Sequence, residues 1–382
     1  MITVSKAISY RPPPPVRPLF FTILLTLALT ALTSACQQQP KKHFSYSIFA
    51  FGTIIDITFY DVDKTLAEKA FKQLQADFDR YHQDWSPWTN GDLALLNKKL
   101  RSDSVISIPD HLIPIIESSI ELSRQSDNYY NPTIGNLINL WQFHKYQEAD
   151  IEPPDEDKVK HLVKQHPQMT DLSINDKNQL ISTNTAVALN FGAFAKGYAI
   201  ALEMEKLKKM GIHNAVINAG GDLSVIGKVI GEASETSAKT SRQTANERAW
   251  NIGIRNPRKN NILASILVNN NESVFTSGDY ERFYQYQGKR YHHILDPATG
   301  YPTQDMQSVT VIHTDAGRAD AAATALLVAG RKNWQRIAKN MGIEYVMLID
   351  SENNIHLTEK MEKRVEFLDK SSTLHKIVSK QL

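Results

Sequence analysis

The chain contains 382 residues, enough for one large domain or two of medium size. Its 42% hydrophobic and 22% charged residues are ordinary values for a globular protein with a sizeable core. The 43 basic and 41 acidic residues nearly balance, and the formal net charge is +2. This composition gives no electrostatic drive toward nucleic acid, which we exclude as a partner, or toward an anionic membrane surface.

Residues 1–35 are predicted to form a secretory signal peptide. Lys6, Arg11 and Arg17 precede the apolar run 19–35, which is the charge and hydrophobicity pattern of an export signal. A transmembrane anchor is the alternative interpretation, but this Thr-containing run is shorter than the roughly 20 apolar residues that span a bilayer.

Cys36 is the predicted lipidation site. It follows Thr33, Ser34 and Ala35, an arrangement that resembles a lipobox, in which the cysteine is acylated and becomes the mature N-terminus. It is the only cysteine, so none remains for an internal disulfide, catalysis, a zinc thiolate site or an iron–sulfur cluster. We expect a lipoprotein of the bacterial cell envelope that faces the periplasm, in either membrane; a plain secretory signal is the second interpretation.

The first half of the mature chain is predicted to alternate strands and helices. Residues 36–47 are polar and predict a tether, and the β-branched and aromatic run 48–60 predicts a strand interrupted at Gly52. Apolar residues at helical spacing predict three helices, at 66–82, 113–123 and 156–163. A fourth helix, 194–210, ends at Gly211, a residue suited to a left-handed helix cap.

The second half continues this alternation around a polar segment. Residues 228–249 have almost no large apolar side chains and predict a flexible insertion, because they bury too little surface to offset their ordering entropy. Strands are expected at 215–218, 250–254, 263–268 and 308–313, and an Ala-rich helix at 319–329 that ends at Gly330. We therefore predict one α+β unit over 48–368, with a polar C-terminal tail at 369–382, or two lobes that share a cleft.

Two glycine-containing turns are candidate ligand contacts. The segment 190–198 contains a turn and then a helix whose first turn carries Lys196, and free N–H groups at a helix start favour anions such as phosphate. The alternative is an ordinary turn with a solvated lysine. The segment 218–222, which contains Gly220 and Gly221, is either a ligand-facing loop or a tight turn that needs positive φ.

Polar residues gather in three further segments. The segment 276–280 follows a strand, and 291–302 contains the adjacent His292 and His293, of which at most one is expected to face a site because neighbouring strand residues point to opposite faces. Asp320 and Thr324 lie four residues apart on a helix and form an oxygen-rich patch suited to Mg²⁺; the alternative is an aspartate that stabilises a helix N-terminus.

In this order the segments resemble the ApbE-like family of FAD:protein FMN transferases, over nearly the whole mature chain. The motifs that carry the resemblance are Phe51-Gly52-Thr53, Asn131-Pro132-Thr133-Ile134-Gly135, Leu140-Trp141, Ala195-Lys196-Gly197-Tyr198, Asn218-Ala219-Gly220-Gly221-Asp222, Thr276-Ser277-Gly278-Asp279-Tyr280, His293-Ile294-Leu295-Asp296-Pro297, Thr299-Gly300 and Ala319-Asp320 with Thr324. Each motif is short, but their conjunction in one chain is specific.

The resemblance implies a fold, a substrate and a metal. The fold would be α+β and related to the T-fold, with antiparallel sheets flanked by helices and two lobes around an FAD cleft. Mg²⁺ would bind the carbonyl of Ala193 and the side chains of Asp320 and Thr324. The implied FAD contacts are Phe51, Trp88, Tyr129, Tyr130, Asn131, Asn190, Lys196 and Leu295.

The implied reaction moves FMN from FAD to a Thr or Ser hydroxyl of an acceptor protein through a phosphoester bond, and releases AMP. His293 is the candidate general base, and Lys196 would neutralise negative charge on the phosphates. Asp279 is the third candidate catalytic residue, and its expected role is to orient other groups, as is that of Asp296. The resemblance points to membrane redox subunits with exported flavin domains as acceptors.

The chain departs from the family pattern at three positions. Many members carry Asp where this chain has Asn131 and Asn190, and some carry Asp where it has Ala323. Asparagine keeps hydrogen-bonding capacity but loses the charge. Two alternatives therefore stay open: an FAD pyrophosphatase that yields FMN and AMP, and a non-catalytic flavin-binding lipoprotein.

The proposed anchor is testable in cells. Cys36→Ala should move the protein out of the membrane fraction, because stable attachment needs acyl chains that only Cys36 can carry. Cell fractionation with a carbonate wash measures this. A variant that still pellets with the membranes would show that the uncleaved segment 19–35 acts as the anchor.

Overall fold

The computed structural model describes residues 43–102, 104–143, 151–230, 247–368 and 375–379. The predicted signal peptide, Cys36 and positions 231–246 of the predicted insertion lie outside the described residues. The described residues belong to one compact unit. None of the helices in the described ranges is both long enough and apolar enough to cross a membrane.

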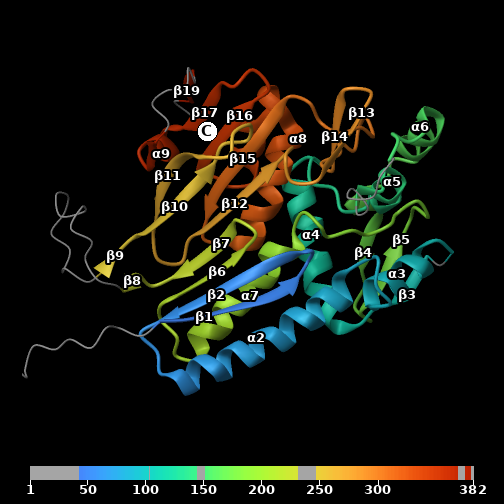
Figure 1. Cartoon of the computed structure of the whole chain (residues 1–382). Helices are drawn as coiled ribbons and strands as arrows, with labels where there is room; N and C mark the ends of the chain where they lie inside the picture. The colour runs from blue at the N-terminus through green and yellow to red at the C-terminus, as the bar shows by residue number, and fades with distance from the viewer. Residues whose placement is uncertain (1–42, 103, 144–150, 231–246, 369–374, 380–382) are drawn as a thin grey trace, which may run out of the picture. The chain divides into compact units, whose positions relative to one another are not determined.

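A large sheet organises this unit (Figure 1). Within the described residues it has nine strands in the order β1-β2-β6-β7-β12-β15-β16-β17-β19, all antiparallel to their neighbours except the parallel pair β17–β19. The strands are β1 (His43–Ala50), β2 (Thr53–Tyr60), β6 (Ala215–Ala219), β7 (Asp222–Ile226), β12 (Ser273–Gly278), β15 (Met306–His313), β16 (Tyr345–Asp350), β17 (Ile355–Thr358) and β19 (Lys376–Ser379).

Three helices cover one face of this sheet, α2 (Lys64–Trp85), α7 (Ala195–Lys209) and α8 (Ala316–Asn340), and α4 (Ile113–Gln125) packs against α8. The sequence of α2 explains its position, because Ala67, Ala70, Leu74 and Phe78 recur at helical spacing and are all buried. Asp63 caps its first turn by accepting a hydrogen bond from the Leu66 amide at 2.9 Å.

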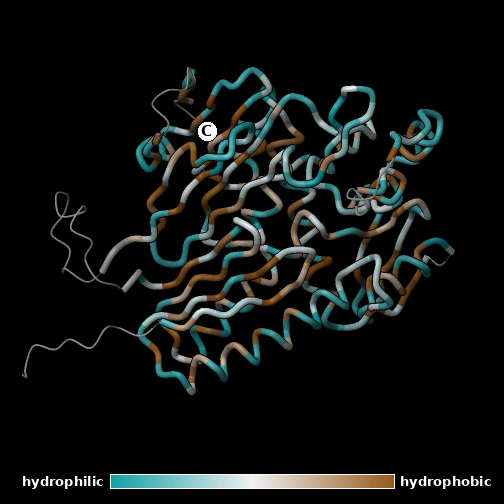
Figure 2. The backbone as a smooth tube through the Cα atoms, in the orientation of Figure 1, coloured by the Kyte–Doolittle hydropathy of each residue, from teal (hydrophilic) through white to brown (hydrophobic). Residues whose placement is uncertain are grey.

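A smaller sheet packs on the opposite face. It contains β10 (Trp250–Arg255), β11 (Ile262–Val268) and β18 (Val365–Phe367), and α9 (Glu359–Glu362) adds Met361 to the same core. Strand β12 shows the alternation that separates the two cores, since Phe275 faces the helices and Val274 faces the smaller sheet. Figure 2 shows hydrophobic residues along the central strands and hydrophilic residues at most of the turns.

The remaining elements surround these layers. A third core, which includes Trp141, Tyr284 and Leu295, joins two short helices to a hairpin, and the Trp141 indole N–H donates to the Gly300 carbonyl at 2.8 Å. The elements are α3 (Asp92–Leu100), β3 (Val105–Ser107), η1 (Asp110–Leu112), α5 (Gly135–Trp141), α6 (Glu156–Lys164), η3 (Met169–Asp171), β4 (Leu172–Ile174), β5 (Gln179–Ser182), β8 (Val229–Ile230), β9 (Glu247–Arg248), β13 (Phe283–Tyr286) and β14 (Lys289–His292).

The α+β class with antiparallel sheets is confirmed, and the two-lobe arrangement stays a prediction. Three boundaries were wrong, one of them that of the predicted insertion 228–249, whose two ends form the antiparallel pair β8–β9. Strand β1 begins at His43, inside the predicted tether, and the predicted C-terminal tail contains β19, because both segments pair with a sheet edge.

The Ala-rich helix also differs from its prediction, because α8 does not end at Gly330. That residue has a left-handed φ of 65°, and the helix resumes after it. The Asp305 carboxylate accepts a hydrogen bond from the Arg331 amide at 2.6 Å, which caps the second segment of the helix.

The central strand makes a stability prediction. Phe275→Ala should lower the free energy of unfolding by about 3–5 kcal/mol, because the ring is fully buried and its removal leaves a cavity. Phe49→Ala is the matched control, since Phe49 is 70% exposed and its loss should change stability by less than about 0.5 kcal/mol. Urea denaturation measures both variants, and equal losses would contradict the burial argument.

Candidate active site

A charged cluster lies where α7 begins beside the large sheet. The Lys196 ammonium, in the first turn of α7, forms an ion pair with the Asp222 carboxylate at the start of β7. The same carboxylate accepts a hydrogen bond from the Thr276 amide at 2.7 Å. Burial alone would lower the pKa of Lys196, but the carboxylates of Asp222 and Asp320 raise it above its ordinary value. Lys196 is therefore a fixed cation at the helix start.

Close packing of α7 against α8 brings Asp320 to this cluster. The Gly197 amide donates to the Asp320 carboxylate at 2.8 Å rather than to a carbonyl of its own helix. A Cβ atom at Gly197 would lie 2.3 Å from the Ala316 carbonyl oxygen, so only glycine permits the contact. The absence of a side chain at residue 197 thus positions a carboxylate from the other helix.

The three predicted metal ligands surround this contact. No backbone N–H in the described ranges donates to the Ala193 carbonyl, because Gly197, its usual partner in a helix, is bound to Asp320. One turn along α8, the Thr324 hydroxyl lies 2.9 Å from the Ser277 hydroxyl. Burial raises the pKa of Asp320 to about 7 against the opposing charge of Lys196. These are hard oxygen donors, of which one is a buried carboxylate, and they fit Mg²⁺.

The two adjacent histidines have different environments. His292 is 2% exposed, and its Nε2 donates to the Thr303 carbonyl at 2.5 Å, which confirms that one of the pair is structural. His293 is half-buried, and its Nδ1 has no hydrogen-bond partner among the described residues. Burial and the positive charge of Arg282 hold the pKa of His293 well below its usual value of 6.5. Its imidazole is therefore neutral near pH 7.

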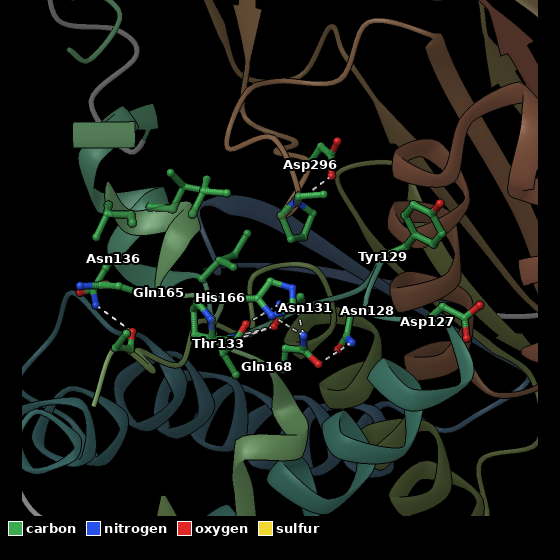
Figure 3. Close-up of a pocket in the computed structure, with 18 of the residues that line it drawn as sticks. Asp127, Asn128, Tyr129, Asn131, Thr133, Asn136, Gln165, His166, Gln168 and Asp296 are labelled. Carbon is green, nitrogen blue, oxygen red and sulfur yellow. Dashed lines mark hydrogen bonds between the residues drawn. The ribbon is translucent and has the colours of Figure 1, made fainter. Parts of the chain in front are cut away.

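A separate cavity of about 280 Å³ lies between the segment that leads into α5 and the loop that follows α6 (Figure 3). Tyr129 and Asn131 line it, together with His166 and Asp296. The Asn131 amide donates to the Pro167 carbonyl at 2.9 Å, while its oxygen accepts from the Thr133 hydroxyl at 2.6 Å. Asparagine therefore holds two chain segments together here, and aspartate lacks the N–H donor that the first bond uses.

Two elements connect the cavity to the charged cluster. The loop after β14 carries His293 near Lys196 and Arg282, and three residues later Asp296 lines the cavity. Helix α8 carries Asp320 before its break, and after it Asn333 donates to the Tyr129 hydroxyl at 3.0 Å. The same loop and the same helix thus reach both the cavity and the charged cluster.

Three predicted residues take structural positions instead. The Tyr130 side chain is 2% exposed and lies 3.1 Å from the Ser119 hydroxyl in the core, so it offers FAD no side-chain contact. Asp279 forms a bidentate pair with Arg258, with one contact of 2.6 Å, which is the geometry of an orienting carboxylate, while its catalytic role stays a prediction. Asn190 accepts a hydrogen bond from the Gly192 amide at 2.9 Å and shapes the turn before α7.

The other predicted FAD contacts lie around the site. Phe51 occupies the β1–β2 turn with a positive φ of 53°, and its amide donates to His82 Nδ1 at 3.2 Å. Trp88 is 46% exposed, and its indole N–H donates to the Asn139 side chain at 3.0 Å. Leu295 is buried in the third core and pairs with Pro302.

Asp222 and Arg282 also lie at the charged cluster, and the sequence predicts no role for either of them. Asp222 ends the glycine turn motif at 218–222, and Arg282 lies two residues beyond the motif at 276–280. A lone acidic or basic residue after a turn gives no signal of its partner. The pairing of Asp222 with Lys196, across 26 positions, is visible only in the folded chain.

Comparison with known proteins agrees with this geometry. Residues 51–347 match the model of the ApbE family, so the chain belongs to that family. It is 32% identical over 333 residues to an FAD:protein FMN transferase of Rhodobacter capsulatus, covering 86% of this chain and 60% of that one. It is 27% identical over 358 residues to an FAD:protein FMN transferase of Treponema pallidum, covering 91% and 95%.

Solved structures share the fold. The ApbE protein of Thermotoga maritima superposes with a TM-score of 0.71 at 26% identity, over 85% of this chain and 99% of that one. The apo form of the Pseudomonas stutzeri flavinyl transferase ApbE gives a TM-score of 0.68 at 24% identity, over 82% and 93%, and supports the fold alone.

Proposed function

We propose that this chain is an FAD:protein FMN transferase, which moves FMN from FAD to an acceptor protein. One observation carries the proposal: a single loop and a single helix join a cavity for a nucleoside to a cluster with one fixed cation, one buried carboxylate and one neutral histidine. Membership of the ApbE family supports the same activity. FAD would lie with its adenosine in the cavity at Tyr129 and its pyrophosphate at the start of α7.

The reaction is a phosphoryl-group transfer to a Thr or Ser hydroxyl. The hydroxyl oxygen attacks the FMN-side phosphorus, the bond between that phosphorus and the bridging oxygen breaks, and AMP leaves. The neutral imidazole of His293 takes the hydroxyl proton, and Lys196 stabilises negative charge on the pyrophosphate. Asp222 orients Lys196, so the ammonium is in place before the charge develops.

Magnesium is part of the proposal. The Ala193 carbonyl, the Asp320 carboxylate and the Thr324 hydroxyl would hold Mg²⁺, which when bound neutralises phosphate charge and orients the leaving group. Family members that carry Asp where this chain has Ala323 would add a further carboxylate, whereas this chain offers one from α8.

Metal dependence follows from this ligand set. Asp320→Ala and Thr324→Val should each abolish FMN transfer and the Mg²⁺-dependent rise in melting temperature with FAD, because each removes an oxygen ligand. EDTA should inactivate the native enzyme, and added Mg²⁺ should restore it. Thr310→Val is the matched control, since it removes a buried hydroxyl that bonds Thr276 instead. Full activity in EDTA would contradict the metal role.

The transfer itself is measured by mass spectrometry. Incubation with FAD, Mg²⁺ and an exported flavin domain of a membrane redox subunit should add FMN to one Thr or Ser and release one AMP. His293→Ala should slow transfer by about two to four orders of magnitude while FAD still binds. In the native enzyme kcat/KM should stay on its plateau at pH 6.5 and fall only well below it, because the pKa of His293 is lowered from 6.5.

The two alternative functions give different outcomes. AMP release at an unchanged rate without acceptor would identify a pyrophosphatase, and FAD binding without any AMP would identify a binding protein. Lys196→Ala separates binding from base catalysis, since it should weaken FAD binding itself. The proposed place of action is the periplasmic side of a bacterial membrane, with the enzyme anchored through Cys36.

A further inference from the structure

Among the three groups assigned to Mg²⁺, the Thr324 hydroxyl differs from the Ala193 carbonyl and the ionised Asp320 carboxylate because it carries a hydrogen. A hydroxyl rotates about its C–O bond, and it presents a lone pair to a cation only when its hydrogen points elsewhere. A metal site that uses a hydroxyl therefore needs a neighbouring acceptor for that hydrogen, just as histidine and carboxylate ligands are oriented by a second group behind them.

The Ser277 hydroxyl, near the end of β12, is that neighbour. Its oxygen lies 2.9 Å from the oxygen of Thr324, and both side chains are half-buried, so the pair remains accessible to an ion. A threonine inside a helix often donates to a carbonyl three or four residues earlier. In the described ranges no backbone carbonyl accepts from the Thr324 hydroxyl. The contact with Ser277 therefore sets the rotation of that hydroxyl.

The alternation of β12 explains why Ser277, and not Thr276, reaches helix α8. Phe275 lies in the core under the helices, and Val274 lies in the core of the smaller sheet, so Ser277 faces the helices. The Thr276 hydroxyl lies on the opposite face, 2.9 Å from the hydroxyl of Thr310 on the neighbouring strand. Ser277 is therefore the residue of this pair that can act on a ligand carried by α8.

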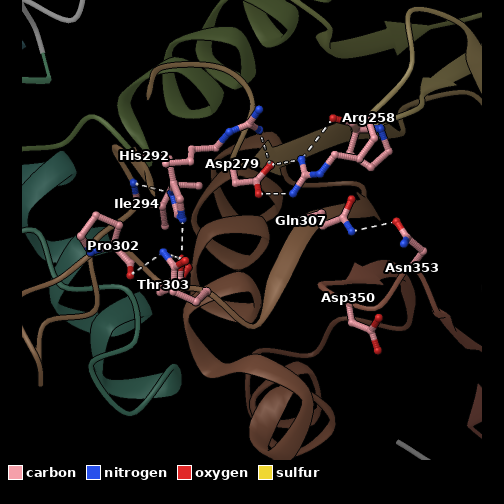
Figure 4. A network of polar contacts seen from close by, with 12 residues as sticks. Arg258, Asp279, His292, Ile294, Pro302, Thr303, Gln307, Asp350 and Asn353 are labelled. Carbon is pink, nitrogen blue, oxygen red and sulfur yellow. Dashed lines mark hydrogen bonds and ion pairs between the residues drawn. The ribbon is translucent and has the colours of Figure 1, made fainter. Parts of the chain in front are cut away.

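The segment that follows Ser277 fixes its position. Arg258 holds the Asp279 carboxylate in a bidentate pair, and Figure 4 shows the two side chains facing each other. The Asp279 amide donates to the Gln307 carbonyl of β15 at 2.9 Å, and Ser277 itself pairs with Val309 of the same strand. The acceptor for the Thr324 hydrogen is thus held by the sheet, independently of the helix that carries the ligand.

We propose that Ser277 is a positioning residue for the metal: its hydroxyl accepts the hydrogen of Thr324 and so turns a lone pair of the Thr324 oxygen toward Mg²⁺. A bound cation draws electron density from the Thr324 oxygen and makes that hydroxyl the donor of the pair. The proposal rests on the proposed function and gives the motif 276–280 a part in metal affinity. Ser277 adds no charge to the site and acts only through Thr324.

Magnesium titration of the FAD-loaded protein, without acceptor, tests this role. Ser277→Ala should raise the Kd for Mg²⁺, obtained from the Mg²⁺-dependent rise in melting temperature, by about tenfold or more, because the ligand remains but is no longer oriented. Ser277→Thr keeps a hydroxyl at the same position and should bind Mg²⁺ within about threefold of the native protein.

Ser273→Ala is the matched control. Ser273 lies on the same strand and the same face, and its hydroxyl also bonds a hydroxyl, that of Ser224, away from the metal ligands. The substitution removes the same atom from the same kind of pair and should leave the Kd for Mg²⁺ unchanged. The melting temperature of each variant without Mg²⁺ shows whether it folds. Should Ser277→Thr fail to fold, the two alanine variants decide.

The rate of transfer gives a second measurement. At saturating Mg²⁺, Ser277→Ala should reach a kcat within about threefold of the native value, because only the affinity for the metal has changed. Thr324→Val, which removes the ligand itself, should not recover at any Mg²⁺ concentration. A residue needed only for folding would not give this dependence on Mg²⁺.

The outcomes separate this inference from the proposed function. A native Kd for Mg²⁺ in Ser277→Ala, or an equal loss of affinity in Ser273→Ala or in a folded Ser277→Thr, overturns the role of Ser277 while the transferase stands. Full transfer by the native enzyme in EDTA overturns the metal site, and this role with it. A native enzyme that transfers no FMN overturns the proposed function, and the Kd values for Mg²⁺ still decide the role of Ser277.

Discussion

The contact between α7 and α8 at Gly197 is the constraint on which the candidate site depends. Two helices approach so closely only because one has no side chain there, and the freed amide then binds Asp320. The same contact leaves the Ala193 carbonyl without its usual helical donor. One glycine therefore sets the position of a carboxylate, a carbonyl and the lysine that precedes it.

The electrostatics of the cluster follow from this packing. Asp222 and Asp320 are both buried near a single ammonium, so with all three groups ionised there is one more negative charge than positive. Burial raises the pKa of Asp320 to about 7, and the negative charge of Asp222 acts in the same direction. A divalent cation at the ligand set we propose would favour the ionised carboxylate, so metal binding and deprotonation of Asp320 would be linked.

The sequence predicts the elements of this fold better than the partners of its polar residues. Periodicity locates α2 and α7 within a few residues, because their apolar faces are regular. It fails at Gly330, where the cap of the second helical segment comes from Asp305, 26 positions away. It also gives no reason for Tyr130 to turn into the core while Tyr129 lines a cavity, since that choice depends on Ser119 and Asn333.

The residue types in a sequence predict which chemistry a site can perform more readily than they predict how its side chains are arranged. The spacing of Asp320 and Thr324 places both on one face of a helix, and the structure has them there, each bonded to a different segment of the chain. The pairing of Asp279 with Arg258 is not visible in the sequence, because neither neighbour of either residue signals it. An ion pair of this kind, visible only in the folded chain, is what distinguishes an orienting carboxylate from a reacting one.

The break in α8 joins two parts of the candidate site through a single residue, Gly330. The segment before Gly330 holds Asp320 at the charged cluster, and the segment after it holds Asn333 and Arg336, which bind residues at the rim of the nucleoside cavity. Because the two helical segments are joined directly at Gly330, the chain fixes the separation between Asp320 and Asn333. A change of backbone conformation at residue 330 would therefore alter the distance between Asp320 and Asn333 without changing any contact within either helical segment.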